Sequence, residues 1–142
     1  MNYRAWMLCA AAAGLCACMG TQRKTPFNVS RELPSTDGSV GVSSKSKSGN
    51  YKLSITLNCM PSPERLVPPA QTYVVWMRKS GDPKAPVENV GALEQGKDKS
   101  ASLNTLTPLE QFEIWISTEA SAQASSPTGQ RLVWANVSSG GQ

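Results

Sequence analysis

Residues 51–58 read YKLSITLN, and this stretch decides the fold because its apolar and polar side chains alternate. Tyr51, Leu53, Ile55 and Leu57 fall on one side of an extended chain, and the polar residues between them fall on the other. The apolar side of a helix combines spacings of three and four residues, whereas the apolar residues here recur at every second position. The pattern therefore predicts a β-strand with one buried face.

Further strands are predicted along the rest of the chain. The same alternation returns in residues 112–117 (FEIWIS), whereas residues 72–77 (TYVVWM) are apolar on both faces, as in the middle of a sheet. Shorter strands are predicted at 39–43, 87–93, 100–103 and 132–137. Turns rich in proline and glycine separate the strands, and no stretch has twelve residues of helical spacing. We therefore expect an all-β fold, an antiparallel, immunoglobulin-like β-sandwich of about seven strands.

The segment before this domain lacks any apolar periodicity. Residues 18–38 are mostly polar and contain Pro26, Pro34 and Gly38, so they are interpreted as a flexible linker. Fully extended, such a linker reaches roughly 65 to 70 Å. The predicted organisation is a signal peptide at 1–17, a lipidated N-terminus and linker at 18–38, and the β-sandwich domain at 39–142.

The first seventeen residues have the features of an export signal. Arg4 gives a short positive start, and residues 5–15 form an uncharged, largely apolar stretch. As a helix this stretch reaches only about 16 Å, roughly half of the hydrocarbon core of a bilayer. The segment is therefore predicted to be a cleaved signal and not a membrane span.

The signal ends in Leu15-Cys16-Ala17-Cys18, which resembles the lipobox of bacterial lipoproteins. In that family the thiol of Cys18 carries diacylglycerol, the bond after Ala17 is cut, and the new amino group is acylated. Several acyl chains make a membrane tether effectively permanent. We therefore expect a lipid-anchored cell-envelope protein. In a cell with an outer membrane, Met19 after the cysteine resembles the default sorting to that membrane, facing the periplasm or the surface. The alternative is an ordinary secretory signal that leaves Cys18 as a free thiol.

Composition excludes several function classes. The formal charge of +4 falls to +3 when Arg4 leaves with the signal, and no run of five like charges occurs, so nucleic acid is not an expected partner. The chain has no His, which excludes Ser-His and Cys-His catalysis and the usual zinc sites. We expect neither a cofactor, a metal site nor enzymatic activity. Cys59, the other cysteine of the processed chain, is interpreted as a small apolar filler.

Two polar clusters are interpreted as structural. Serines and lysines adjoin one another in residues 43–47, and the pattern favours an exposed edge strand or loop over a Ser-Lys dyad. Glu110, Glu113 and Glu119 lie close in sequence, with Glu113 expected on an exposed strand face and Glu119 in the loop beyond it. They are therefore not interpreted as a glycosidase pair.

The C-terminal two thirds carry a family resemblance. Residues 70–77 (AQTYVVWM) resemble a strand with Tyr and Trp three positions apart, followed by 90–93 (VGAL), 112–116 (FEIWI), Glu119, 127–129 (PTG) and the strand at 132–137. In this order they are similar to the extracytoplasmic domain of anti-sigma-K factors. The resemblance implies a β-sandwich module outside the cytoplasm. It does not imply sigma-factor binding, because a separate cytoplasmic domain, joined by a membrane helix, performs that role in the family.

Trp115 is the aromatic residue whose burial the strand pattern does not explain. It alternates with Phe112, Ile114 and Ile116 and should face away from the core, where it either contacts a partner or packs under the loop at 117–130. Together these features predict a membrane-tethered, non-enzymatic envelope lipoprotein that binds another envelope protein as a sensor, adaptor or assembly component. The alternative is a structural or adhesive surface module that binds glycan or peptidoglycan.

Overall fold

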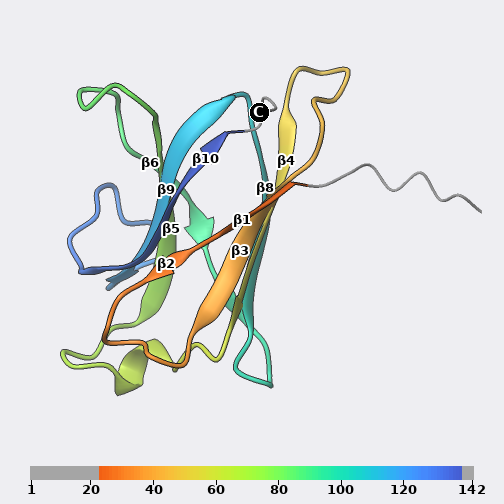
Figure 1. Cartoon of the computed structure of the whole chain (residues 1–142). Helices are drawn as coiled ribbons and strands as arrows, with labels where there is room; N and C mark the ends of the chain where they lie inside the picture. The colour runs from red at the N-terminus through yellow and green to blue at the C-terminus, as the bar shows by residue number, and fades with distance from the viewer. Residues whose placement is uncertain (1–22, 139–142) are drawn as a thin grey trace, which may run out of the picture.

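A computed structural model describes residues 23–138 of the chain, which form two packed antiparallel β-sheets (Figure 1). The strands are β1 (Arg23–Pro26), β2 (Asn28–Val29), β3 (Asp37–Val42), β4 (Tyr51–Asn58), β5 (Thr72–Lys79), β6 (Glu88–Ala92), β7 (Glu94–Gln95), β8 (Ala101–Thr107), β9 (Gln111–Glu119) and β10 (Arg131–Ser138). A short 3-10 helix, η1 (Pro63–Arg65), follows β4. Sheet A has the order β1-β3-β4-β8-β7, and sheet B has the order β2-β10-β9-β5-β6. The predicted antiparallel β-sandwich is confirmed.

All seven predicted strands are present, as β3, β4, β5, β6, β8, β9 and β10. β5 lies between β9 and β6, which confirms its predicted place inside a sheet. The strands that the sequence pattern missed are β1, β2 and β7, which have only two to four residues each. So short a strand shows too few alternations to be recognised from its sequence.

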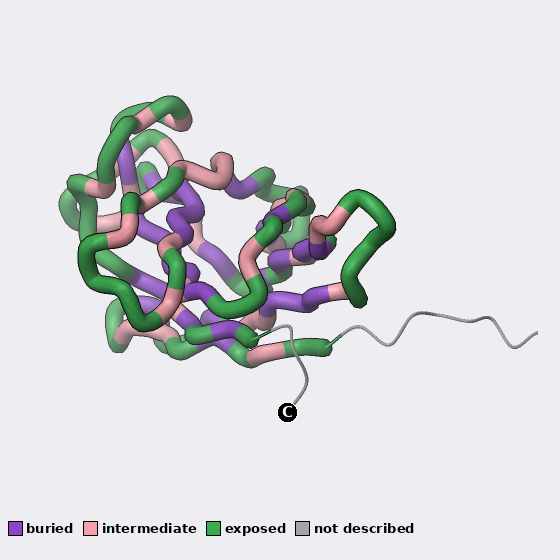
Figure 2. The backbone as a smooth tube through the Cα atoms, turned by 90° about the horizontal axis from the view of Figure 1, so that it is seen from above, coloured by how far each residue is buried: buried purple, intermediate pink, exposed green. Residues whose placement is uncertain are grey.

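The alternation of residues 51–58 becomes alternating burial in β4. Tyr51, Leu53, Ile55 and Leu57 are buried, whereas the residues between them are at least partly exposed. β4 is the central strand of sheet A, and its inward face packs in one core with inward residues of sheet B that include Phe112, Ile114, Ile116, Tyr73 and Val75. Burying one such side chain contributes about 1.5 to 3 kcal/mol. Figure 2 shows the buried interior surrounded by exposed loops.

Sheet B buries part of its outer face as well. Val74, Trp76 and Trp115 form a second buried cluster there, separate from the main core. Ala124 from the loop between β9 and β10 packs against this cluster, as do Val87 and Trp134. The covering of both faces explains why residues 73–77 are apolar without interruption.

The predicted linker is wrong between residues 23 and 38, because this segment belongs to the sandwich. β1 pairs with β3, β2 pairs with β10, and Phe27 between them is only 8% exposed. Leu33 and Thr36, in the turn that follows, are also buried. Pro26 favoured the interpretation as a linker, but it is the last residue of the edge strand β1. At that position the missing N–H of proline interrupts no hydrogen bond between strands.

This correction shortens the predicted connection to the membrane. Arg23, the first residue of β1, is five positions after Cys18, so the connection reaches about 17 Å instead of 65 to 70 Å. The predicted signal peptide and Cys18 itself lie outside the described residues. Between residues 23 and 138, the structure contains no helix with the length and apolar character needed to cross a membrane.

Candidate functional site

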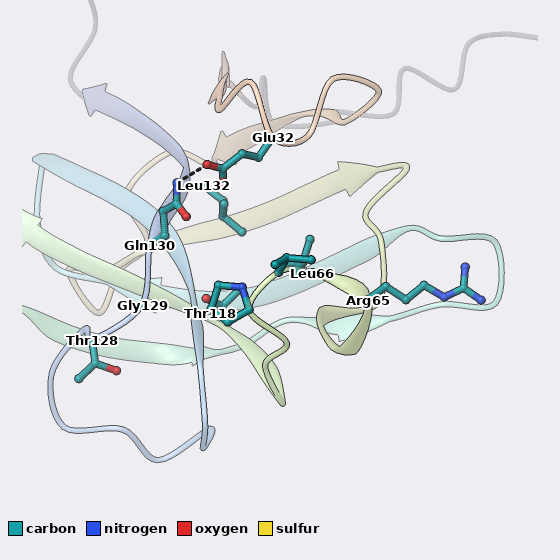
Figure 3. A pocket seen from close by; sticks show the side chains of 10 residues that line it. Glu32, Arg65, Leu66, Thr118, Thr128, Gly129, Gln130 and Leu132 are labelled. Atoms are coloured by element: carbon teal, nitrogen blue, oxygen red, sulfur yellow. Dashed lines mark hydrogen bonds between the residues drawn. The ribbon is translucent and has the colours of Figure 1, made fainter.

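A groove of about 580 Å³ lies at the end of the sandwich that carries η1 (Figure 3). Three segments distant in sequence line it: the turn after β2, the residues around the end of η1, and the junction of β9 with β10. The lining residues are Glu32, Arg65, Leu66, Val67, Pro68, Thr118, Thr128, Gly129, Gln130 and Leu132. Apolar side chains stand beside hydrogen-bonding groups, so the groove suits a ligand that has both kinds of surface.

The segment that follows η1 gives the groove an apolar wall. Val67 is 95% exposed and Pro68 beside it is also exposed, whereas Leu66 is half-buried and packs against the core. The loop before η1 is fixed to sheet B, because the Tyr73 hydroxyl donates to the carbonyl oxygen of Pro61 over 2.6 Å. Burial raises the pKa of Tyr73 to about 12, so this hydroxyl stays protonated and keeps its hydrogen bond at neutral pH.

The opposite wall, the loop before β10, is held by the carboxylate of Glu119 at the end of β9. Its oxygens accept hydrogen bonds from the Thr128 N–H (3.1 Å to each), the Thr128 hydroxyl (2.6 Å), the Gly129 N–H (3.1 Å) and the Ser117 hydroxyl (2.6 Å). A Cβ atom at Gly129 would overlap the carbonyl oxygen of Thr118, so the loop approaches β9 as closely as only glycine allows. One carboxylate therefore sets the shape of this wall.

Glu119 stays ionised although it is only 3% exposed. Desolvation by burial raises its pKa, but the hydrogen bonds from Ser117, Thr128 and Gly129 outweigh that effect, and the pKa lies below its ordinary value of 4.5. The Ser117 hydroxyl also accepts a hydrogen bond of 2.9 Å from the indole N–H of Trp76. A continuous chain of hydrogen bonds thus joins the second buried cluster to the groove.

The turn after β2 closes the third side of the groove. The side-chain amide of Gln130 donates to Glu32 over 2.6 Å, and this bond links the turn to the loop before β10 (Figure 3). Leu33 fastens the turn to the core, and the Thr36 hydroxyl donates to the carbonyl oxygen of Cys59 over 2.8 Å. The groove is therefore held on all three sides by contacts within the domain.

Trp115, the predicted contact residue, lies elsewhere, on the outer face of sheet B. It is 5% exposed, which agrees with the alternative of packing within the domain, and Ala124 of the loop between β9 and β10 packs against its cluster. Its role as a partner contact stays a prediction. The guanidinium carbon of Arg131 lies 4.6 Å from the ring centroid, and that of Arg78 lies at 5.7 Å. These cation–π contacts stabilise the covered ring. Trp115 therefore has no part in the groove.

The glutamates of the predicted polar cluster are dispersed and do not form one site. Glu113 forms an ion pair of 2.6 Å with Arg78, and Glu110 accepts a hydrogen bond of 3.3 Å from the Tyr51 hydroxyl. Glu119 lies in the strand end and not in the loop where it was expected. In the part of the chain that the structure describes, no group of three or more His, Cys, Asp or Glu residues could hold a metal ion.

Two other predictions about polar residues have different outcomes. Residues 43–50 form the exposed loop between β3 and β4, which confirms the structural interpretation of its serines and lysines. The interpretation of Cys59 as an apolar filler is wrong, because its side chain is exposed. The chain turns sharply there, with a φ of 58° at Cys59, and Met60 fills the core position instead.

Sequence reasoning missed the groove because it joins three segments that are far apart in the chain. Glu119 was considered with Glu110 and Glu113 and again within the family resemblance, but its contact with residues 127–129 was not predicted. The sequence signal that could have indicated this contact is Glu119 itself, a lone acidic residue at the end of an apolar strand. When such a carboxylate is buried, it needs several hydrogen-bond donors nearby.

The fold and the groove together define the chain as an antiparallel β-sandwich domain with a groove at one end. No known family model matches the sequence, and no curated protein matches it. The similarity to the extracytoplasmic domain of anti-sigma-K factors therefore stays a prediction.

Proposed function

We propose that this protein is a lipid-tethered, non-enzymatic envelope protein that binds another envelope protein through the groove, as a sensor, adaptor or assembly component. The observation that carries the proposal is the apolar wall around Val67, which is nearly fully exposed. Its segment is closed onto η1 by the Ala70 N–H, which donates to the carbonyl oxygen of Pro63 over 3.0 Å. A rigid apolar contact ringed by polar groups is the usual centre of a protein-binding surface.

The polar groups of the groove support recognition without catalysis. Thr118, Thr128 and Gln130 offer hydroxyl and amide groups, and Glu32 already accepts a hydrogen bond from Gln130. The chain has no His to act as a base for a hydroxyl nucleophile. The lining is therefore suited to hydrogen-bonding a peptide segment.

The tether rests on the sequence that ends at Cys18. The apolar segment, the small residue Ala17 and the cysteine follow the order of a lipobox, and the sandwich begins five residues later. A domain held this close to a bilayer meets other membrane-associated proteins at a high effective concentration. An adaptor or sensor role fits that arrangement.

The alternative is a structural or adhesive module that binds glycan or peptidoglycan. It is favoured by the hydroxyl, amide and carboxylate groups of the groove, which could bond sugar hydroxyls. The tryptophans support it less, because Trp76 and Trp115 are buried and offer no open ring face.

Photo-crosslinking in intact cells tests the proposal. A photoreactive amino acid at Val67 should give adducts with a specific envelope protein, identified by mass spectrometry. The matched control carries it at Leu106, which is 61% exposed on the outer face of sheet A, far from the groove. Equal adducts from both positions would contradict the groove as the binding site, and sedimentation with purified wall material would favour the alternative.

A further inference from the structure

The charges of the domain are divided unequally between its two ends. The end that contains the start of β1 and the loops at 43–50, 80–87 and 108–110 is called the tether end. Its basic residues are Arg23, Lys24, Lys45, Lys47, Lys52, Arg78, Lys79 and Lys84, and its acidic residues are Asp82, Glu88, Glu110 and Glu113. These charges give the tether end a net charge of +4.

The opposite end, called the groove end, is close to neutral. Its basic residues are Arg31, Arg65, Lys97, Lys99 and Arg131, and its acidic residues are Glu32, Asp37, Glu64, Glu94, Asp98 and Glu119. The net charge there is −1. The domain therefore has a strong charge asymmetry along its strands.

The strand register gathers five basic residues into one patch at the tether end. Arg23 pairs with Val42, the last residue of β3, and the loop with Lys45 and Lys47 begins there. Lys24 and Lys52 follow from β1 and β4, and all five basic side chains are exposed. Figure 2 looks down on this end and shows exposed loops over the buried interior.

The position of the patch coincides with the point where the chain leads to the predicted anchor. Arg23 is five residues from Cys18, a reach of about 17 Å. β4 alone, with eight residues, is about 27 Å long. The connection from Cys18 is therefore too short to reach from the tether end to the groove end. The basic patch, by contrast, is next to the point where this connection joins the domain.

We infer that the tether end binds the anionic phospholipid headgroups of the membrane that holds Cys18, so that the groove is turned away from the bilayer. This inference rests on the proposed lipid tether. A cationic surface next to an anionic bilayer is attracted to it, and each Lys or Arg near the surface strengthens binding about fivefold. The anchor removes most of the entropic cost of the encounter, so a few such residues suffice to orient the domain.

Amine footprinting of the purified, full lipoprotein tests the orientation. The protein is placed in vesicles of phosphatidylcholine with or without phosphatidylglycerol, modified with an amine-reactive reagent, and analysed by mass spectrometry. Lys24, Lys45, Lys47 and Lys52 should react several-fold more slowly on the anionic vesicles. Lys97 and Lys99, at the groove end, are the internal controls and should react equally on both.

A variant that lacks two lysine charges of the tether end tests whether the protection depends on them. Lys45→Gln with Lys47→Gln should restore much of the reactivity of Lys52, whereas Lys97→Gln should leave the protection unchanged. Protection of Lys97 and Lys99 equal to that of the tether end would overturn the inference. So would a pattern that does not depend on phosphatidylglycerol.

The mass of the peptide that contains Cys18, from the same samples, tests the tether separately. Lipidated Cys18 without selective protection would leave the proposed function standing and overturn the inferred orientation. Unmodified Cys18 would refute the tether. If Cys18 is unmodified but anionic vesicles still protect the tether-end lysines selectively, the lipid-binding surface is supported without the tether. If Cys18 is unmodified and all lysines react equally, both the tether and the lipid-binding surface are refuted.

Discussion

Replacing Glu119 by Gln tests the claim that one buried carboxylate holds the groove wall. The change keeps the size of the side chain but turns one acceptor oxygen into an NH2 group. The carboxylate accepts from Ser117, Thr128 and Gly129, so either orientation of the amide leaves at least one backbone N–H facing another donor. Hydrogen bonds to a charged group contribute about 1.5 to 3 kcal/mol each, and the variant avoids the cost of burying a charge. We expect a loss of about 2 to 4 kcal/mol in the free energy of unfolding at pH 7.

Urea unfolding followed by tryptophan fluorescence measures this loss. Glu113→Gln is the matched control in the same strand, because its ion pair with Arg78 is partly exposed and should contribute at most about 1 kcal/mol. A loss below about 0.5 kcal/mol for Glu119→Gln, or one no larger than for Glu113→Gln, would refute the reasoning.

The effect of Glu119→Gln has a predicted pH dependence. The pKa of Glu119 in the folded protein lies below its ordinary value of 4.5, so ionised Glu119 stabilises the fold fully above about pH 4.5. This contribution is lost as the pH falls through the folded pKa. The stability difference between the wild type and Glu119→Gln should therefore be constant near neutrality and shrink below pH 4.5. A difference that grows in acid would contradict the assigned hydrogen bonds.

Three further changes give separate tests. Gly129→Ala should destabilise the protein by at least about 2 kcal/mol in urea, because its Cβ would overlap the Thr118 carbonyl oxygen; a neutral effect would show that the loop can move away. Phe27→Ala should cost about 3 to 4 kcal/mol by the same assay, whereas a residue in a flexible linker would cost nothing. Val67→Ser should change stability by less than about 0.5 kcal/mol, because the side chain is 95% exposed, but should reduce the recovery of the partner in a pull-down; unchanged recovery would argue against the groove.

The strands with regular patterns could be predicted, because period-two alternation follows directly from the geometry of an extended chain. β4 and β9 show the pattern of a strand with one face in the main core, and the unbroken apolar run in β5 indicates a strand covered on both faces. β1 and β2 were missed because short edge strands with proline resemble a linker. Their pairing depends on β3 and β10, which lie elsewhere in the chain.

The candidate site was less predictable than the fold. The alternation correctly places Trp115 on the outer face of sheet B, but the guanidinium groups over its ring come from Arg78 and Arg131, which no local pattern connects with it. The groove depends in the same way on distant segments, joined by the bonds of Glu119 to Thr128 and of Gln130 to Glu32. Such contacts arise from loop packing, which periodicity does not encode.

Fractionation of cells that express Cys18→Ser tests the central claim of a lipid tether most directly. Cys16→Ser is the matched control, because it changes the neighbouring cysteine and keeps the lipid acceptor. We predict that Cys16→Ser stays in the membrane fraction, whereas Cys18→Ser loses its anchor and appears in the soluble fraction. Recovery of Cys18→Ser in the membrane fraction at the level of the wild type would contradict it.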